Sequence, residues 1–102
     1  MEINIQSIHF KADQKLIDYI TKKLHKLSTF HENIIDAQVY LKVEHASDNN
    51  NKILEVKLNV YGNAIFVEEH CRTFECAIDL AYEALRQQLV KYKDKLKATS
   101  AH

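Results

Sequence analysis

The stretch of sequence that decides the fold runs from residue 36 to residue 67, DAQVYLKVEHASDNNNKILEVKLNVYGNAIFV. Apolar and polar residues alternate from Ala37 to Val43, again from Leu54 to Val60, and again from Ile65 to Val67. A period of two places successive side chains on opposite faces of a sheet, so one face is buried and the other is wet. This stretch therefore predicts three consecutive strands that share one apolar face.

Two polar segments separate these strands. Residues 47–51, SDNNN, carry no apolar side chain that could pack, so they predict a turn. Gly62 and Asn63 are expected to supply the positive φ values of a tight hairpin. Such short connections predict antiparallel pairing, and we expect an antiparallel sheet.

Segments with helical periodicity precede and follow these three strands in the sequence. Asp13 is the expected N-cap of a helix that ends near Leu27, and Thr73 is the expected N-cap of a helix of ~25 residues that ends near Lys97. Each helix has one apolar stripe. The stripes are Leu16, Ile17, Ile20, Leu24 and Leu27 in the first helix, and Phe74, Ile78, Ala81, Leu85, Leu89, Tyr92 and Leu96 in the second.

A first strand is predicted over residues 2–10, where Ile3, Ile5 and Ile8 lie among polar residues. The expected order is β-α-β-β-β-α, an α+β fold in which a four-stranded sheet has both helices packed on one face. No linker or repeat interrupts the chain. We therefore expect one domain over residues 1–97 and a short C-terminal tail over residues 98–102.

The formal charge of zero conceals regions of opposite sign. The 14 Lys and Arg balance 14 Asp and Glu over 102 residues. Residues 1–30 nevertheless have five bases against three acids (+2), residues 31–85 have four against ten (−6), and residues 86–102 have five against one (+4). A chain polarised in this way is expected to have an anionic partner.

The basic residues fall on the polar sides of the two predicted helices. In the first helix Lys15, Tyr19, Lys22 and Lys26 lie within ~60° of one another. In the second, Arg86 shares a column with Lys93 and Lys97, and Lys91 shares another with Lys95. Positive charge on rigid helices suits the repeated phosphates of RNA. Acids early and bases late in a helix also complement its dipole, so a merely solvated helix remains an alternative.

Catalytic and metal-binding patterns are weak in this sequence. Cys71 and Cys76 are spaced C-x4-C, without the second ligand pair of a structural zinc site, and Cys76 is expected to be a partly exposed thiol. Glu68 and Glu69 are adjacent in a strand, so they point to opposite faces. A single glycine excludes a glycine-rich phosphate loop. We expect no enzyme, no metal, no cofactor and no small-molecule substrate.

The sequence also indicates the compartment. No apolar run approaches the ~18 residues of a membrane span, and no signal peptide begins the chain. Two cysteines without an export signal favour a reducing compartment. We therefore expect a cytoplasmic protein that has no membrane partner.

Four segments together resemble one known family. Residues 85–97, LRQQLVKYKDKLK, resemble the closing helix of the ribosome hibernation-promoting factor and ribosome-associated inhibitor A family, and residues 76–79, CAID, resemble the opening of that helix. Residues 19–27, YITKKLHKL, resemble its first helix, and residues 41–44, LKVE, its second strand. The resemblance covers essentially the whole chain in the order of the predicted elements.

The resemblance implies a non-enzymatic protein that binds the small ribosomal subunit and its rRNA where messenger and transfer RNAs would lie. Such a protein inhibits translation under stress or in stationary phase and preserves idle ribosomes. The rRNA-contacting bases of the family correspond to Lys23, Lys26, Lys91, Lys93, Lys95 and Lys97, and the stripe geometry adds Lys22 and Arg86.

This chain departs from the family pattern at Gln87, where arginine is common, and at Thr73 and Glu75, where the family has Asp and Tyr. Because the chain ends five residues after Lys97, it is expected to be a short member without an additional C-terminal domain. Self-association is not implied.

Two other functions are compatible with the same pattern. One is a small protein-interaction module that associates through an open sheet edge or through the acidic middle segment. The other is a general double-stranded-RNA-binding domain, because that fold also places two helices on one sheet face.

Overall fold

The computed structural model describes residues 1–29, 31–44 and 50–100, with side chains described as far as Asp94. Six elements follow one another: β1 (Glu2–Ser7), α1 (Gln14–Ser28), β2 (Ile34–Val43), β3 (Lys52–Val60), β4 (Asn63–Cys71) and α2 (Phe74–Ser100). The predicted α+β class and β-α-β-β-β-α order are confirmed.

Both predicted N-caps are confirmed. The Asp13 carboxylate accepts a hydrogen bond from the backbone N–H of Leu16 at 2.9 Å, and the Thr73 hydroxyl accepts one from the N–H of Cys76 at 3.0 Å. Each cap satisfies a backbone donor that has no partner within its helix. Local chemistry therefore sets where each helix begins.

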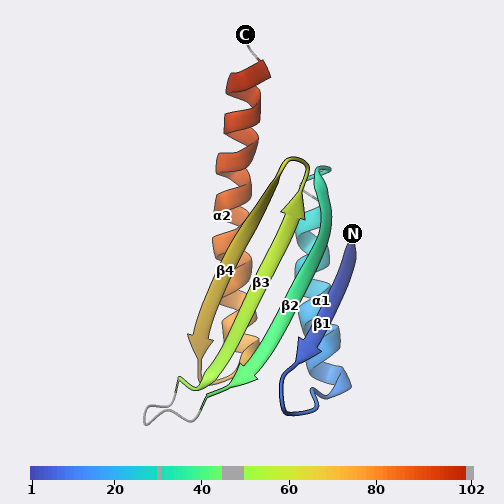
Figure 1. Ribbon diagram of the computed structural model, residues 1–102, viewed down its shortest axis with the longest axis vertical. Helices are drawn as coiled ribbons and strands as arrows, with labels where there is room; N and C mark the ends of the chain where they lie inside the picture. The colour runs from blue at the N-terminus through green and yellow to red at the C-terminus, as the bar shows by residue number, and fades with distance from the viewer. Residues whose placement is uncertain (30, 45–49, 101–102) are drawn as a thin grey trace.

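The sheet has the order β1-β2-β3-β4 and is mixed (Figure 1). Strands β2, β3 and β4 pair antiparallel as predicted. The prediction of a wholly antiparallel sheet is wrong for β1, which runs parallel to β2 with Glu2 beside Asp36 and Ser7 beside Leu41. The reason is α1, which returns the chain to the end of the sheet where β1 began, as a βαβ crossover does.

The two helices cover the same face of the sheet and run in the same direction (Figure 1). Between them and the sheet lies a single core, and the largest side chains with no appreciable exposure come from both helices and from β2 and β3: Ile20, Leu24, Leu27, Val39, Leu41, Leu54, Val56, Leu58, Ile78, Leu85 and Leu89. The described residues of the apolar stripes therefore pack as predicted, although Leu16, Ile17 and Tyr92 are only partly buried; Leu96 lies outside the described side chains.

Val43 was expected to point into the core, and this expectation is wrong. Its side chain is 41% exposed. Val43 is the last residue of β2 and pairs with Lys52, so the apolar face already gives way there to the polar connection. Most of the turn predicted at residues 47–51 lies outside the described residues.

The hairpin between β3 and β4 turns at Tyr61 and Gly62, and β4 begins at Asn63. Gly62 has φ +81°, as expected for this glycine. Asn63 does not have the positive φ that was predicted, because it already pairs with Val60 in the ladder; among the described non-glycine residues only His9 has a positive φ.

The second helix extends beyond the sheet at its C-terminal end, and this gives the molecule its elongated shape of 51 × 26 × 17 Å (Figure 1). Near the point where α2 leaves the sheet, the Tyr92 hydroxyl donates a hydrogen bond of 2.6 Å to the carbonyl oxygen of Tyr61 in the hairpin. The last turns of α2, which carry several of the predicted RNA-binding lysines, therefore project past the domain.

Gly62→Ala tests the turn. No atom would meet the added Cβ within 4 Å, so the cost comes from the backbone conformation alone. A left-handed φ costs an L-residue about 1–2 kcal/mol, and we expect the midpoint of urea unfolding to fall accordingly. Gly62→Asn is the matched control, since asparagine tolerates this conformation better. Equal losses of stability in both variants would contradict this explanation.

Candidate nucleic-acid interface

Two residues from each helix form a cluster in the seam between α1 and α2. We call Tyr19, Lys23, Asp79 and Tyr82 the interhelical cluster. The Tyr19 hydroxyl donates a hydrogen bond of 2.7 Å to the Asp79 carboxylate, and the Lys23 ammonium lies 3.2 Å from the same oxygen. That ammonium also lies 5.3 Å from the centroid of the Tyr82 ring, within cation–π distance. The cluster therefore links α1 to α2 at the outer surface.

The protonation states in this cluster reinforce one another. The hydrogen bond from Tyr19 and then the Lys23 charge hold the pKa of Asp79 below its ordinary value. The hydrogen bond to Asp79 raises the pKa of Lys23, and the same carboxylate raises the pKa of Tyr19. At neutral pH Asp79 is therefore ionised and its charge is matched by Lys23.

This pairing changes the interpretation of Lys23. The sequence placed it among the RNA-contacting bases, but its side chain is only 24% exposed and is directed at Asp79. Its ammonium is already partnered and has less charge to offer a phosphate than a free lysine would. In the structure, the Lys23 side chain lies between α1 and α2, where it pairs with Asp79.

Lys22 and Lys26 lie on the exposed side of α1. Within the described residues neither ammonium has a hydrogen bond or an ion pair. Lys26 is close enough to Asp79 for its charge to lower the pKa of that carboxyl. These two lysines therefore present positive charge on the solvent side of α1, as the predicted stripe requires.

The bases of α2 fall into different environments. The Arg86 guanidinium pairs with Glu83 at 3.2 Å, three residues earlier on the exposed side of the helix. Lys91 and Lys93 are exposed and have no ion pair within the described part of the chain. Lys95 and Lys97 lie in the last turns of α2, but their side chains are outside the described set.

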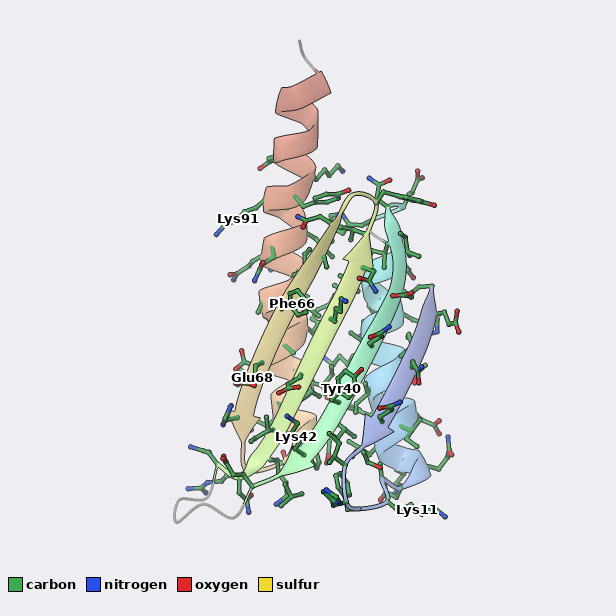
Figure 2. All side chains as sticks on the ribbon, in the orientation of Figure 1. Lys11, Tyr40, Lys42, Phe66, Glu68 and Lys91 are labelled. Atoms are coloured by element: carbon green, nitrogen blue, oxygen red, sulfur yellow. The ribbon has the colours of Figure 1, made fainter. Side chains whose placement is uncertain are left out.

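Lys91 and Lys93 leave α2 on different sides. Lys91 points away from α1 (Figure 2). Lys93 lies over the connection between α1 and β2, where it lines an open groove of about 340 Å³ with His31, Glu32, Asn33 and Tyr92. Burial and the Lys93 charge lower the pKa of His31, so this histidine is neutral at neutral pH. The two described lysines therefore lie on different sides of α2, near the point where the helix leaves the sheet.

Bases on the opposite face of the molecule are engaged locally. On the open sheet face the Lys42 ammonium pairs with Glu55 at 3.1 Å, and the Lys57 ammonium lies 5.6 Å from the Phe66 ring centroid. Glu68 pairs with His70 on the same face at 3.1 Å (Figure 2). Among the described residues, Lys42 on this face has an ion pair and Lys57 only the contact with an aromatic ring, whereas Lys22 and Lys26 on the helix layer have neither.

Asp79, Tyr82 and His31 were not among the site residues predicted from the sequence. A signal for the first two exists, since Tyr19 and Lys23 are four residues apart and Asp79 and Tyr82 are three apart, each pair on one helical face. The sequence does not indicate that these two faces meet.

The described residues form no group of three or more His, Cys, Asp or Glu that could hold a metal ion. Glu68 and Glu69 lie on opposite sides of β4, as predicted, since Glu69 has the same orientation as buried Val67 and Cys71. Neither helix, over its described residues, is long and apolar enough to cross a membrane.

Asp79→Asn tests the interhelical cluster. Because the folded-state pKa of Asp79 is lowered, its contribution to stability is present above the unfolded pKa, near 4, and is lost as the pH falls through the folded value. We expect the variant to lose stability at pH 7 by an amount in the range of a partly exposed ion pair, about 1 kcal/mol or less, since the Asp79 side chain is 48% exposed.

The difference between wild type and Asp79→Asn should shrink in urea unfolding at pH 3. Glu83→Gln is the control, because it removes an exposed carboxylate of the same helix that pairs only with Arg86. A constant difference between pH 3 and pH 7 would rule out the charge on Asp79 as the source of the effect.

Comparisons with known proteins agree with this architecture. A family model described as Sigma 54 modulation protein / S30EA ribosomal protein matches residues 3–97. The ribosome hibernation promotion factor of Deinococcus radiodurans is 38% identical over 84 residues, which are 81% of this chain but 44% of that protein. The ribosome hibernation promoting factor of Klebsiella oxytoca is 32% identical over 97 residues, covering 95% of this chain and 98% of that protein.

Two solved structures share the fold. A ribosomal subunit interface protein from Coxiella burnetii has a TM-score of 0.81 at 21% identity, covering 92% of this chain and 99% of that one. The N-terminal domain of Protein Y from Thermus thermophilus has a TM-score of 0.78 at 24% identity, covering 90% of this chain and 99% of that one.

The family is one of ribosome hibernation factors, which are not enzymes, as expected from the sequence. The resemblance inferred from the helices is confirmed at the level of the family. Since the family model matches residues 3–97 and the Klebsiella relative is similar over nearly its whole length, the chain belongs to the Sigma 54 modulation protein / S30EA ribosomal protein family.

Proposed function

We propose that this protein binds rRNA of the small ribosomal subunit through its helix layer and holds the ribosome in an inactive, hibernating state. The names of its relatives, ribosome hibernation promoting factors, support a role at the ribosome. The proposed site is the channel for messenger and transfer RNAs, so that bound protein excludes both. Stress or stationary phase is the proposed condition, and the cytoplasm the proposed location.

The observation that carries the proposal is the set of unpartnered lysines on the helix layer. Lys22, Lys26, Lys91 and Lys93 are exposed and have no ion pair within the described residues. Each ammonium can neutralise a phosphate and release a counterion, which supplies most of the affinity in electrostatic RNA binding. The helices hold these charges at fixed spacing, so binding to RNA costs little conformational entropy.

The remaining predicted bases have three different roles in this proposal. Arg86 is held by Glu83 in an exposed ion pair worth about 0–1 kcal/mol, so its guanidinium can exchange that carboxylate for a phosphate. Lys23 is a positioning residue, because its pairing with Asp79 sets how α1 lies beside α2. Lys95 and Lys97 extend the basic tip of α2 as further rRNA contacts.

An enclosing RNA site fits this tip better than a flat one. Lys91 and Lys93 leave α2 on different sides, near the point where the helix begins to project past the sheet (Figure 2). A groove with phosphates on more than one side would engage both lysines at once, whereas a single duplex surface would engage one. This favours a folded rRNA channel over a general double-stranded-RNA site.

Co-sedimentation with purified small subunits at increasing salt tests the interface. We expect Lys22→Glu/Lys26→Glu to weaken binding at least about tenfold and to flatten the dependence of log K on log salt by roughly 1.5, because two phosphate contacts are lost. Lys42→Glu/Lys57→Glu is the matched control, with the same charge change on the opposite face. Equal losses in the two variants would refute the assignment to the helix layer.

The tip of α2 is tested in the same assay and in cell-free translation. Lys91, Lys93, Lys95 and Lys97 replaced together by Glu should abolish co-sedimentation and the inhibition of translation that wild type produces. An excess of arbitrary duplex RNA should not displace wild type from small subunits. Unchanged binding of the quadruple variant, or ready displacement by duplex RNA, would overturn the proposal.

A further inference from the structure

Two cysteine side chains meet where β4 joins α2. Cys71 is the last residue of β4 and Cys76 lies in the first turn of α2. Their sulfur atoms are 3.0 Å apart although both cysteines are free. Cys71 is only 4% exposed, whereas Cys76 is exposed to solvent. One accessible thiol is therefore in direct contact with one protected thiol.

The backbone on both sides of this contact is held in place. Cys71 pairs with Lys52 of β3, so the strand position is set by the sheet. The Thr73 hydroxyl caps α2 through the N–H of Cys76. Between them Phe74 is buried and stacks on Phe10 with ring centroids 5.5 Å apart. The fold, rather than chance motion of a loop, brings the two sulfur atoms together.

The two thiols differ in reactivity. Cys76 is the exposed residue of the pair, so its thiol is the one that a dissolved oxidant meets first. Burial, with the neighbouring Cys76 thiol, raises the pKa of Cys71 to about 11, so Cys71 is a neutral thiol at physiological pH and is shielded from direct oxidation. An oriented neighbour at contact distance has an effective concentration far above that of any thiol in solution. Cys71 is thus placed to react with Cys76 once Cys76 has been oxidised.

We propose that Cys71 and Cys76 are a peroxide-reactive pair that closes to an intramolecular disulfide. The Cys76 thiol loses its proton and the thiolate attacks hydrogen peroxide; the O–O bond breaks, and the hydroxide that leaves takes up that proton as water, so Cys76 becomes a sulfenic acid. The Cys71 sulfur then attacks the Cys76 sulfur and gives up its proton, and the sulfenic oxygen leaves as water. Two thiols are oxidised and one peroxide is reduced to two molecules of water.

The disulfide requires only a small rearrangement. A bonded pair of sulfur atoms lies about 2.05 Å apart, so the two atoms must approach by about 1 Å. Exposed Cys76 can supply this movement by rotation of its side chain. The bond would tie the end of β4 to the start of α2, one helical turn before Asp79. This inference stands independently of ribosome binding.

Peptide mapping of the full chain after peroxide treatment tests the proposal. Trypsin cleaves after Arg72, so Cys71 lies on the peptide of residues 58–72 and Cys76 on that of residues 73–86. We expect these two peptides to be joined in the monomer, to separate on reduction, and the intact protein to lose the mass of two hydrogen atoms. A peroxide-treated wild type whose two peptides remain unlinked would overturn the proposal.

Single variants distinguish the roles of the two thiols. Cys76→Ser should abolish the linkage and leave Cys71 unmodified, while Cys71→Ser should leave Cys76 as a sulfenic acid that dimedone traps. Because the oriented Cys71 outcompetes the reagent, trapping in wild type should be at least about tenfold lower than in Cys71→Ser. Equal trapping in both would count against the pair. If Cys71→Ser does not fold, the linkage in wild type and its loss in Cys76→Ser decide the question.

Discussion

Burial of a single apolar sheet face beneath two helices is the constraint on which the rest of this structure depends. Leu24 and Leu27 from α1, and Leu85 and Leu89 from α2, are fully buried against the sheet. Since each helix has only one apolar stripe, packing that stripe inward orients the rest of its circumference toward solvent. Lys22 and Lys26 are thereby placed on the helix layer without an ion pair to another described residue.

The same constraint reconciles a net charge of zero with the proposed nucleic-acid partner. Lysines on the open sheet face are engaged by nearby groups, as Lys42 is by Glu55 and Lys57 by Phe66. On the helix layer Lys22 and Lys26 have no such partner within the described residues. A phosphate backbone responds to the local density of unpaired charge within about a Debye length, ~8–10 Å, and not to the sum over the chain. The molecule can therefore be neutral overall and still offer one basic layer.

The two ends of α2 differ in their surroundings: the first turns are anchored to the rest of the domain, and the last turns project past the sheet. The first turns are capped by Thr73, stacked through Phe74, and joined to α1 through Asp79. The last contact described is the bond from Tyr92 to the hairpin, after which the helix projects past the sheet. A rigid base with a projecting basic tip allows the tip to enter a narrow site while the core remains undisturbed. The thiol pair lies at the anchored end, where a covalent bond can form without moving the tip.

The sequence by itself determined the features that depend on spacing over a few residues. The periods of two and 3.6, the caps at Asp13 and Thr73, and the glycine turn at Gly62 identify six elements, their order and the face that each one buries. These features could be predicted because hydrogen bonds and side-chain directions within one element follow from neighbouring residues. The basic stripe on α1 could be predicted for the same reason.

Only the tertiary structure decided how distant residues meet. The direction of β1 was predicted wrongly, and the engagement of Lys23 and the contact of the two cysteine sulfurs were absent from the predictions. Tyr19 and Asp79 are 60 residues apart in the chain, and nothing near either of them indicates the other. The alternating pattern of β1 is the same for parallel and antiparallel pairing, and a lysine on a helix flank looks alike whether free or paired. Such contacts depend on how packed elements lie beside one another, which local periodicity does not encode.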